Sequence, residues 1–251
     1  MTHSAEPFNV VIPARHDSTR LPGKPLLELA GKPLILRTVE QVQRAGPETL
    51  VVATDDARIE AVCREAGVSV MMTGAAHQSG TDRMNEVADV LGWDADRIVI
   101  NVQGDEPFIP PDNIIQVAKL LEMRTASIAT LAAALDPSQL NDPNTVKVVC
   151  AKNGFALYFS RAVVPWLRDI EDVPPVQALR HIGVYGYRRE ALRAFAEAGP
   201  CALEQHERLE QLRALWQGWP IIVGLAKSAP PPGVDTPADL ETARARFNSA
   251  N

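Results

Sequence analysis

The stretch Asn9-Val10-Val11-Ile12-Pro13-Ala14-Arg15-His16-Asp17-Ser18-Thr19-Arg20-Leu21-Pro22-Gly23-Lys24-Pro25-Leu26 decides the fold of this chain. It begins as a short apolar run, typical of a buried parallel strand, and breaks at Pro13 into a loop. The loop carries three cations, Arg15, Arg20 and Lys24, which repel one another unless an anion lies across them. Guanidinium and ammonium groups are the usual ligands of phosphate oxygens, so the loop predicts a polyanion site. A solvated basic loop is the alternative, but such a loop does not need the stiffness that its prolines provide.

Two common phosphate-binding patterns are absent from this loop. No Gly-Lys-Ser/Thr triplet follows the strand, and the three-glycine dinucleotide fingerprint is also missing. Nucleotide-binding folds with a different phosphate-binding loop are therefore favoured.

The composition of the whole chain limits what such a site can serve. A length of 251 residues fits one large α/β domain or two small ones, and 46% apolar residues suffice for a substantial core. With 25 basic and 31 acidic residues the net charge is −6, which argues against non-specific binding to nucleic acid or an anionic membrane. Polyanion binding should therefore be confined to a local pocket.

Cysteine usage and hydropathy predict a cellular location. The three cysteines, Cys63, Cys150 and Cys201, are odd in number and lack the paired spacing of a zinc site or a disulfide framework. The first residues do not resemble a signal peptide, and no apolar run approaches the roughly 20 residues of a membrane span. We expect a cytoplasmic protein without membrane insertion.

Strand-like and helical patterns alternate after the opening loop, and this predicts the fold class. The expected elements are a helix from Leu34 to Val42, strands at 49–54, 68–73, 97–102 and 127–135, and helices at 57–66, 80–91 and 111–124. This alternation is typical of an α/β protein with a doubly wound, mostly parallel sheet, in which ligands bind beyond the carboxyl ends of the strands. We expect one α/β domain over residues 1–251.

The second half of the chain departs from this alternation. Two β-rich runs flank Lys152-Asn-Gly154 and predict a hairpin, within a region of about 136–175 that we expect to form a smaller subdomain for dimerisation. Further on, the patterns predict a strand at 180–187, one continuous helix at 203–216, a strand at 221–226 and a closing helix after Thr236.

Asp105 is the first candidate metal ligand. It lies in Gln103-Gly-Asp-Glu-Pro107, at the carboxyl end of a predicted strand and on a tight glycine turn. Mg²⁺ is held by one or two carboxylates while substrate phosphates supply further oxygens, so a carboxylate beside a phosphate-binding loop suits it. A turn-forming aspartate is the alternative.

Several motifs, taken together, resemble one enzyme family. They are the opening loop, His77-Gln-Ser-Gly-Thr81, Gln103-Gly-Asp-Glu-Pro107, Arg180-His-Ile-Gly-Val-Tyr-Gly-Tyr187, Leu209-Glu-Gln-Leu212 and Gly233-Val-Asp-Thr-Pro237. In this order they resemble the sugar-acid cytidylyltransferases, most closely those specific for 3-deoxy-manno-octulosonate (Kdo). The resemblance extends from Val10 to about Leu240.

The resemblance implies a reaction and its partners. CTP and Kdo would give CMP-Kdo and pyrophosphate for lipopolysaccharide biosynthesis, with Mg²⁺ as cofactor and a homodimer as the assembly. Catalysis would involve Arg15, Arg20, Lys24, Asp105 and Asp235, of which Asp105 and Asp235 would bind the metal. The nucleotide would contact Ala14, Arg15, Lys24, Ser79, Gly80, Thr81, Arg83 and Gln103. The sugar would contact Gln103, Arg161, Arg168, His181, Tyr185, Glu210 and Gln211.

Alternatives remain at the level of residues and of function. Ser79 could be only a helix cap, Asp235 only the residue before a helix, His181 only structural, and Glu210 and Gln211 only solvated. The chain could activate another sugar acid, such as 8-amino-Kdo or sialic acid, or be a non-catalytic nucleotide-sugar sensor. A sensor would be expected to have lost Lys24 or a metal carboxylate.

Overall fold

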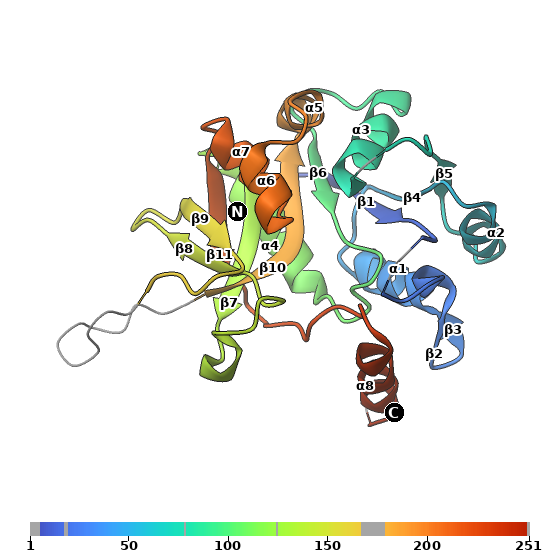
Figure 1. Cartoon of the computed structure of the whole chain (residues 1–251). Helices are drawn as coiled ribbons and strands as arrows, with labels where there is room; N and C mark the ends of the chain where they lie inside the picture. Colours follow the sequence, from blue (N-terminus) through green and yellow to red (C-terminus); the bar gives the residue numbers. More distant parts are fainter. Residues whose placement is uncertain (1–5, 18–19, 78, 124, 167–178, 250–251) are drawn as a thin grey trace, which may run out of the picture.

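One mixed sheet with helices on both faces forms the frame of the molecule (Figure 1). A computed structural model describes residues 6–17, 20–77, 79–123, 125–166 and 179–249. The sheet has the strand order β11-β7-β10-β6-β1-β4-β5, in which β10 is antiparallel to its neighbours β6 and β7 and the other pairs are parallel. Its strands are β1 (Phe8–Ala14), β4 (Thr49–Thr54), β5 (Val70–Met72), β6 (Ile98–Asn101), β7 (Ile128–Ala134), β10 (Leu179–Arg188) and β11 (Ile221–Leu225). The predicted α/β class with a mostly parallel sheet is confirmed.

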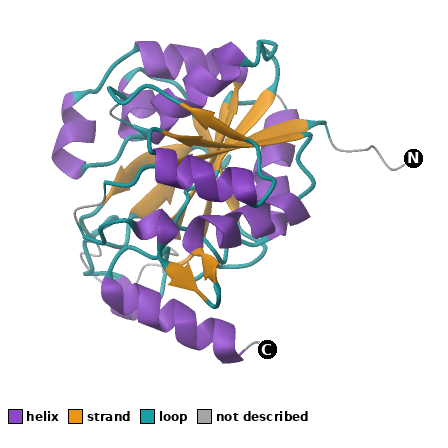
Figure 2. Cartoon of the chain, turned by 90° about the vertical axis from the view of Figure 1, so that its right-hand side faces the viewer, coloured by secondary structure: helices purple, strands orange, loops and turns teal. Residues whose placement is uncertain are grey.

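Helices cover the two faces of the sheet (Figure 2). One face packs against α1 (Leu34–Arg44), α2 (Ala57–Glu65) and α4 (Pro111–Glu122), and the other against α3 (Gly80–Val90), α5 (Arg189–Glu197), α6 (Ala202–Glu207) and α7 (Leu212–Trp216). Successive residues of a strand point to opposite faces, and accordingly Val10 and Ile12 join the first core while Val11 joins the second. Because both faces are covered, β1 is buried along its whole length and is apolar apart from Asn9.

The sequence pattern predicted that the first strand breaks at Pro13, and this is wrong: β1 continues to Ala14. The Val11 carbonyl accepts from the Val102 amide (3.2 Å), so the main-chain polar groups of Pro13, two residues further, face the same side. β6 pairs with β1 only as far as Val11. Pro13 therefore lacks an N–H where no ladder bond would be made, and the strand tolerates it.

The C-terminal helix α8 (Pro237–Ser249) lies at the lower edge of the molecule in Figure 1. Its Leu240 and Ala243 pack with Leu29 and Leu34 in a third apolar cluster. Beside it are η1 (Lys24–Leu26) and the short strands β2 (Glu28–Leu29) and β3 (Lys32–Pro33). This packing fixes the ends of the opening loop and of the β11–α8 connection relative to each other.

The predicted hairpin consists of β8 (Lys147–Cys150) and β9 (Ala156–Ser160), and it follows η2 (Pro137–Gln139). Gly154 at its turn has φ 85°, a left-handed conformation that glycine adopts without strain. β8 pairs with the start of β10, and Phe155 bridges to β11. The hairpin thus extends the main sheet and shares its second core through Val148 and Phe159.

The predicted continuous helix over 203–216 is wrong. The chain forms α6, leaves the helical conformation at Arg208 (φ 53°), and resumes in α7 at Leu212. The Ser160 hydroxyl (2.6 Å) and the Arg161 amide (2.9 Å) both donate to the Glu207 carboxylate and tie the end of α6 to β9. The apolar periodicity correctly predicted that Leu209 and Leu212 are buried, but Leu215 is half-buried and Trp216, expected in the same stripe, is exposed. It contained no signal for the contacts of Glu207.

Candidate active site

Three adjoining cavities open where the parallel strands end. The charged cavity, about 530 Å³, is lined by Pro13, Ala14, Arg15, Asp17, Arg20, Lys24, Pro25, Gln103, Gly104, Asp105 and Asp235. The aromatic cavity, about 200 Å³, is lined by Thr81, Asn101, Gln103, His181, Gly183, Tyr185, Tyr187, Leu209, Glu210 and Gln211. The proline cavity, about 650 Å³, includes Arg20, Glu106, Arg180, His181, Gly183, residues 230–233 and Asp235 in its lining. Shared lining residues make the three cavities one continuous site.

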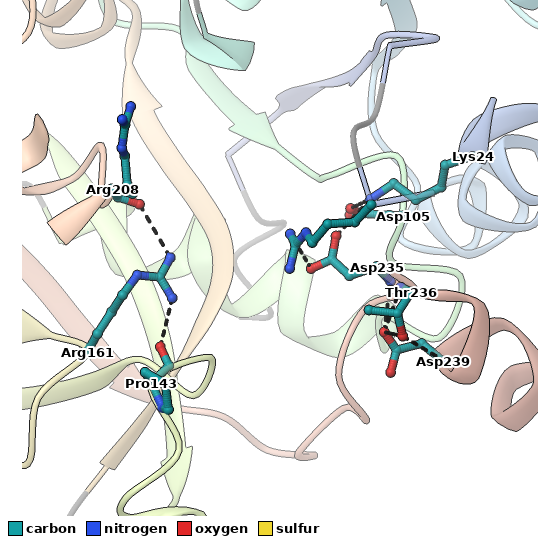
Figure 3. A network of polar contacts seen from close by, with 9 residues as sticks. Lys24, Asp105, Pro143, Arg161, Arg208, Asp235, Thr236 and Asp239 are labelled. Carbon is teal, nitrogen blue, oxygen red and sulfur yellow. Dashed lines mark hydrogen bonds and ion pairs between the residues drawn. The ribbon is translucent and has the colours of Figure 1, made fainter. Parts of the chain in front are cut away.

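The structure brings Asp105 and Asp235 together, although they lie 130 positions apart in the sequence (235 minus 105). The Val234 amide donates to the Asp105 carbonyl (2.9 Å), which joins the β11–α8 connection to the loop after β6. A Cβ on Gly233 would lie only 3.2 Å from that same carbonyl, which is tighter than most real Cβ contacts, so the close approach favours glycine. Asp239 accepts from the amide (2.8 Å) and the hydroxyl (2.8 Å) of Thr236 and fixes the start of α8 (Figure 3).

Lys24 lies between these two carboxylates (Figure 3). Its ammonium group donates to Asp105 Oδ2 and to Asp235 Oδ1, the second at 2.9 Å. Burial by itself would lower the pKa of Lys24, but the two carboxylates outweigh burial and raise the pKa above its ordinary value. Arg20 Nη2 pairs with the other oxygen of Asp235 at 3.1 Å. The cluster is therefore a balanced group of cations and anions.

The donor set suits a metal only together with a ligand. Within the residues that the structure describes, no group of three or more His, Cys, Asp or Glu side chains could hold a metal ion. Two carboxylates beside a cationic cavity are nevertheless what Mg²⁺ uses when phosphates supply further oxygens. Arg15 is exposed at this cavity, and none of the described residues forms a hydrogen bond or ion pair with its side chain.

The segment Ser79–Arg83 is engaged mainly in structural contacts. Ser79 caps α3 in a reciprocal capping box with Asp82, and Gly80 lies so close to Pro13 that a Cβ would come within 2.9 Å of its ring. Arg83 is buried and donates to Thr73 (2.8 Å) and to Asp55 (2.5 Å). Of this segment, only Thr81 lines one of the three cavities.

The aromatic cavity brings His181 and Tyr185 together, with ring centroids 5.2 Å apart. Between Ile182 and Tyr185, β10 takes three steps while β7 takes one, so a bulge adds two residues. Because two is an even number, His181 and Tyr185 remain on the same face. Thr130 Oγ1 lies 2.8 Å from the Val184 carbonyl and 3.0 Å from His181 Nε2, so it can donate to the first and accept from the second.

Buried polar groups in this cavity lack protein partners. Tyr185 OH, Glu210 Oε1 and Gln211 Nε2 are buried without a hydrogen bond from any described residue, whereas Glu210 Oε2 accepts from Thr81 (3.0 Å). Burial raises the pKa of Glu210 and of Tyr185, and burial together with Arg180 lowers the pKa of His181 to about 3. Buried polar atoms are normally satisfied, so these three indicate a polar ligand.

Of the two arginines predicted to contact the sugar, Arg161 is bound to main-chain carbonyls. The Arg161 guanidinium donates to the carbonyls of Glu207 (2.7 Å), Pro143 (2.8 Å) and Arg208 (3.5 Å), and Figure 3 shows this group apart from the carboxylate cluster. Arg161 lines none of the three cavities, because its donors are used by main-chain carbonyls. Arg168 lies outside the described residues.

Two charged groups in the proline cavity were not singled out from the sequence. Arg180 is half-buried and donates to the Pro230 carbonyl (2.8 Å), with no ion pair to any described residue. Burial and the neighbouring Asp105 raise the pKa of Glu106 to about 8. Arg180 precedes His181 in the motif Arg180–Tyr187, and this position beside a predicted sugar contact was the only indication in the sequence that Arg180 lies at the site.

Comparisons with known proteins agree with this geometry. The family profile described as Cytidylyltransferase matches residues 9–225. The 3-deoxy-manno-octulosonate cytidylyltransferases of Aliivibrio fischeri and of Vibrio cholerae are each 51% identical to the chain, over 243 and 242 residues. These alignments cover 95% and 94% of this chain, and 98% and 96% of the relatives.

Solved structures agree as well. A structure of CMP:2-keto-3-deoxy-manno-octonic acid synthetase complexed with CTP superimposes with a TM-score of 0.90 and 40% identity, covering 98% of this chain and 100% of that one. A cytidylyltransferase from Leptospira borgpetersenii, at 17% identity, shares the fold alone, with a TM-score of 0.63 over 96% of this chain and 87% of its own. No helix in the described part of the chain is long and apolar enough to cross a membrane. From the site and these comparisons together, the chain belongs to the 3-deoxy-manno-octulosonate cytidylyltransferase family.

Proposed function

We propose that this chain transfers the cytidylyl group of CTP to Kdo and releases pyrophosphate. The observation that carries the proposal is the Lys24–Asp105–Asp235 cluster, which lies where a cationic cavity adjoins a cavity with unsatisfied polar groups. The relatives that carry this activity in their names support it, and so does the CTP bound to a similar structure.

The charged cavity supplies the groups that a nucleoside triphosphate needs. Arg15, Arg20 and Lys24 would neutralise the phosphates and orient them for in-line displacement. Asp105 and Asp235 would hold Mg²⁺, which when bound would neutralise further phosphate charge. Ala14, the segment from Ser79 to Arg83, and Gln103 are proposed to contact the nucleoside; the polar side chains of Ser79 and Arg83 are already engaged, so their contribution would be positional.

The aromatic cavity suits a polyhydroxylated substrate. Tyr185 OH and Gln211 Nε2 form no hydrogen bond with any described residue, and Glu210 Oε1 has only a long ion pair with Arg213 (3.9 Å). These atoms offer a substrate one donor-acceptor, one donor and one acceptor. Gln103 lines this cavity and the charged cavity, so a sugar held there would present its anomeric hydroxyl toward the α-phosphorus. The hydroxyl would attack in line while pyrophosphate leaves on the opposite side, and the residues contribute chiefly by positioning and charge neutralisation.

The substrate carboxylate needs a cation. Arg161 would have to give up its carbonyl partners to serve, and Arg168 is outside the described residues. Arg180, half-buried and without an ion pair next to His181, is the better-placed candidate, because a partly desolvated cation gains from an anionic partner.

A homodimer is part of the proposal. β9 pairs along its length only with β8 among the described strands, and its Leu157 is 60% exposed. An open strand edge with an exposed apolar side chain is prone to pairing with another chain. The hairpin region of about 136–175 would therefore form the contact between two copies.

The test is pyrophosphate release from CTP with Kdo. We expect Asp105→Asn and Asp235→Asn each to lose about a hundredfold or more in kcat, because each removes one of two metal carboxylates. Asp94→Asn, at an exposed acid after α3, is the matched control and should keep full activity. Replacing CTP by UTP or ATP, and Kdo by 8-amino-Kdo or sialic acid, identifies the true substrates. Full activity in either variant would contradict the metal role.

A further inference from the structure

Lys24 is fixed in its position between the two carboxylates. Its main-chain amide donates to the Leu21 carbonyl (3.2 Å), and the preceding Gly23 has φ 66°, a left-handed turn conformation. The Lys24 side chain is only 13% exposed, against 24% for Asp105 and 41% for Asp235. The ammonium therefore sits at the inner side of the cluster, while the acids face the cavity.

The main chain brings the loops that carry the two acids together. The Val234–Asp105 hydrogen bond joins main-chain atoms, and the missing side chain of Gly233 lets the two loops approach closely beside it. Two carboxylates at this distance repel each other, more strongly the less water lies between them. Of the described cations only Lys24 pairs with both acids, since Arg20 pairs with Asp235 alone and is itself largely exposed.

We propose that Lys24 is the resident cation of the metal site: in the free protein its ammonium holds the two carboxylates in place, and the metal must displace it. A metal would need carboxylate oxygens of Asp105 and Asp235, and Lys24 already occupies Oδ2 of the first and Oδ1 of the second. Lys24 leaves at low cost only when phosphate oxygens offer it a new partner, so metal and CTP enter together. The inference rests on the metal role given to these acids under the proposed function, and it makes Lys24 a positioning residue for them as well as a phosphate ligand.

The experiment titrates the full chain with Mn²⁺ in the absence of CTP and of any sugar acid. The electron paramagnetic resonance signal of free Mn²⁺ measures how much metal is bound. If Lys24 occupies the site, Lys24→Met should bind Mn²⁺ about tenfold more tightly than the unmodified protein, or better, because the competitor is gone. Lys24→Gln should do the same. Lys32→Met, which removes an exposed lysine paired with Glu40, is the control and should leave Mn²⁺ affinity unchanged.

The companion measurements separate this inference from the proposed function. Adding CTP should tighten Mn²⁺ binding far more in the unmodified protein than in Lys24→Met, and Lys24→Met/Asp105→Asn should lose the gain in metal affinity. Unchanged or weaker Mn²⁺ binding by folded Lys24 variants overturns the proposal, even if the enzyme is fully active. Tighter binding sustains it, even if Kdo proves not to be the substrate.

One measurement on the unmodified side chain stands if neither variant folds. Lysines labelled with ¹³C at Cε during expression report their surroundings by nuclear magnetic resonance and keep all three ammonium donors. Saturating Mg²⁺ with CTP should shift the Lys24 signal, while the Lys32 signal stays unchanged. A Lys24 signal that does not move would overturn the exchange.

Discussion

At the scale of single residues, the aromatic cavity is built from side chains whose burial alters their protonation. The pKa of His181 falls to about 3 through burial and the nearby Arg180, and the pKa of Glu210 rises because it is buried. A neutral histidine that donates from Nε2 to Thr130 has an acceptor at Nδ1, which protonation would remove. The cavity thus offers fixed donors and acceptors, which suits recognition of hydroxyl groups.

His181 should make the protein less stable in mild acid. Its pKa in the folded chain, about 3, lies below the ordinary value of 6.5, so below pH 6.5 only the unfolded chain takes up this proton. As the pH is lowered from 6.5 toward 3, this group should reduce the free energy of unfolding by up to about 1.4 kcal/mol per pH unit. His181→Gln should lose that contribution, which urea unfolding at pH 7.5 and at pH 5 would measure. His206→Gln, on the exposed side of α6, should keep it, and equal pH dependence in all three proteins would contradict the burial of His181.

Glu210 should contribute to binding the sugar acid and not the nucleotide. Glu210→Gln replaces a carboxylate whose Oε1 has no hydrogen-bond partner and which accepts from Thr81. Loss of a charged acceptor costs about 1.5–3 kcal/mol, so we expect kcat/KM for Kdo to fall about tenfold to a hundredfold. Steady-state kinetics should show an unchanged KM for CTP, and Glu190→Gln on α5 should match the unmodified protein. A raised KM for CTP alone would place Glu210 at the nucleotide instead.

At the scale of elements, the connection between α6 and α7 shows what could be predicted and what could not. The apolar stripe through Leu209 and Leu212 was readable from the sequence, because burial requires helical periodicity. The break at Arg208 was not, since a non-glycine residue in the left-handed region is an unusual choice that only the contacts of Glu207 explain. This break turns Glu210 and Gln211 toward the cavity.

Substitutions at Arg208 should separate backbone strain from side-chain chemistry. Its side chain is exposed, and its φ of 53° is costly for a β-branched residue and free for glycine. Arg208→Gly should keep or raise the melting temperature, while Arg208→Val should lose about 1–2 kcal/mol of stability. Thermal unfolding of the pair measures this directly. Identical melting temperatures would mean that the connection has another backbone conformation.

Arg161 should act on stability before it acts on catalysis. Its guanidinium bonds three main-chain carbonyls that join β9, the η2 region and the end of α6. Arg161→Lys cannot make all three bonds, and we expect a loss of about 1–3 kcal/mol in unfolding free energy. Denaturant unfolding and the KM for Kdo, measured on the same samples, distinguish the two roles. A large rise in KM without a loss of stability would favour the sugar contact expected from the family resemblance.

At the scale of the whole molecule, the sequence predicted the layers of sheet and helices but not which strands lie next to each other in the sheet. Runs such as those within Phe8–Ala14 and Thr49–Thr54 were predicted to be buried strands, because apolar residues predominate on both faces and the runs end at turn residues. The insertion of β10 between β6 and β7 has no such signal, since hydrophobic patterning does not specify which strands pair. The meeting of Asp105 and Asp235 could be expected, because ligands of such sheets bind beyond the carboxyl ends of the strands. The position of Lys24 between the two acids could not be predicted, because no sequence pattern specifies that contact.

The proposed assembly can be tested at the free edge of the sheet. Leu157→Glu places a charge on the exposed face of β9 and should convert a dimer into a monomer, which light scattering after size-exclusion chromatography would detect as a halved molar mass. Leu225→Glu, at a similarly exposed leucine on β11, should leave the mass unchanged. A monomeric unmodified protein, or a dimer that survives Leu157→Glu, would contradict this contact.

The bulge in β10 restricts how the length of this chain can vary. Removing either Gly183 or Val184 alone would leave a one-residue bulge or make the register of β10 slip, and a slip would turn His181 and Tyr185 to opposite sides of the sheet. Removing both would restore an ordinary ladder and keep the two rings on the same side. Insertions and deletions at this point should therefore be tolerated best in even numbers, which keep both side chains of the binding surface on one face without a new bulge.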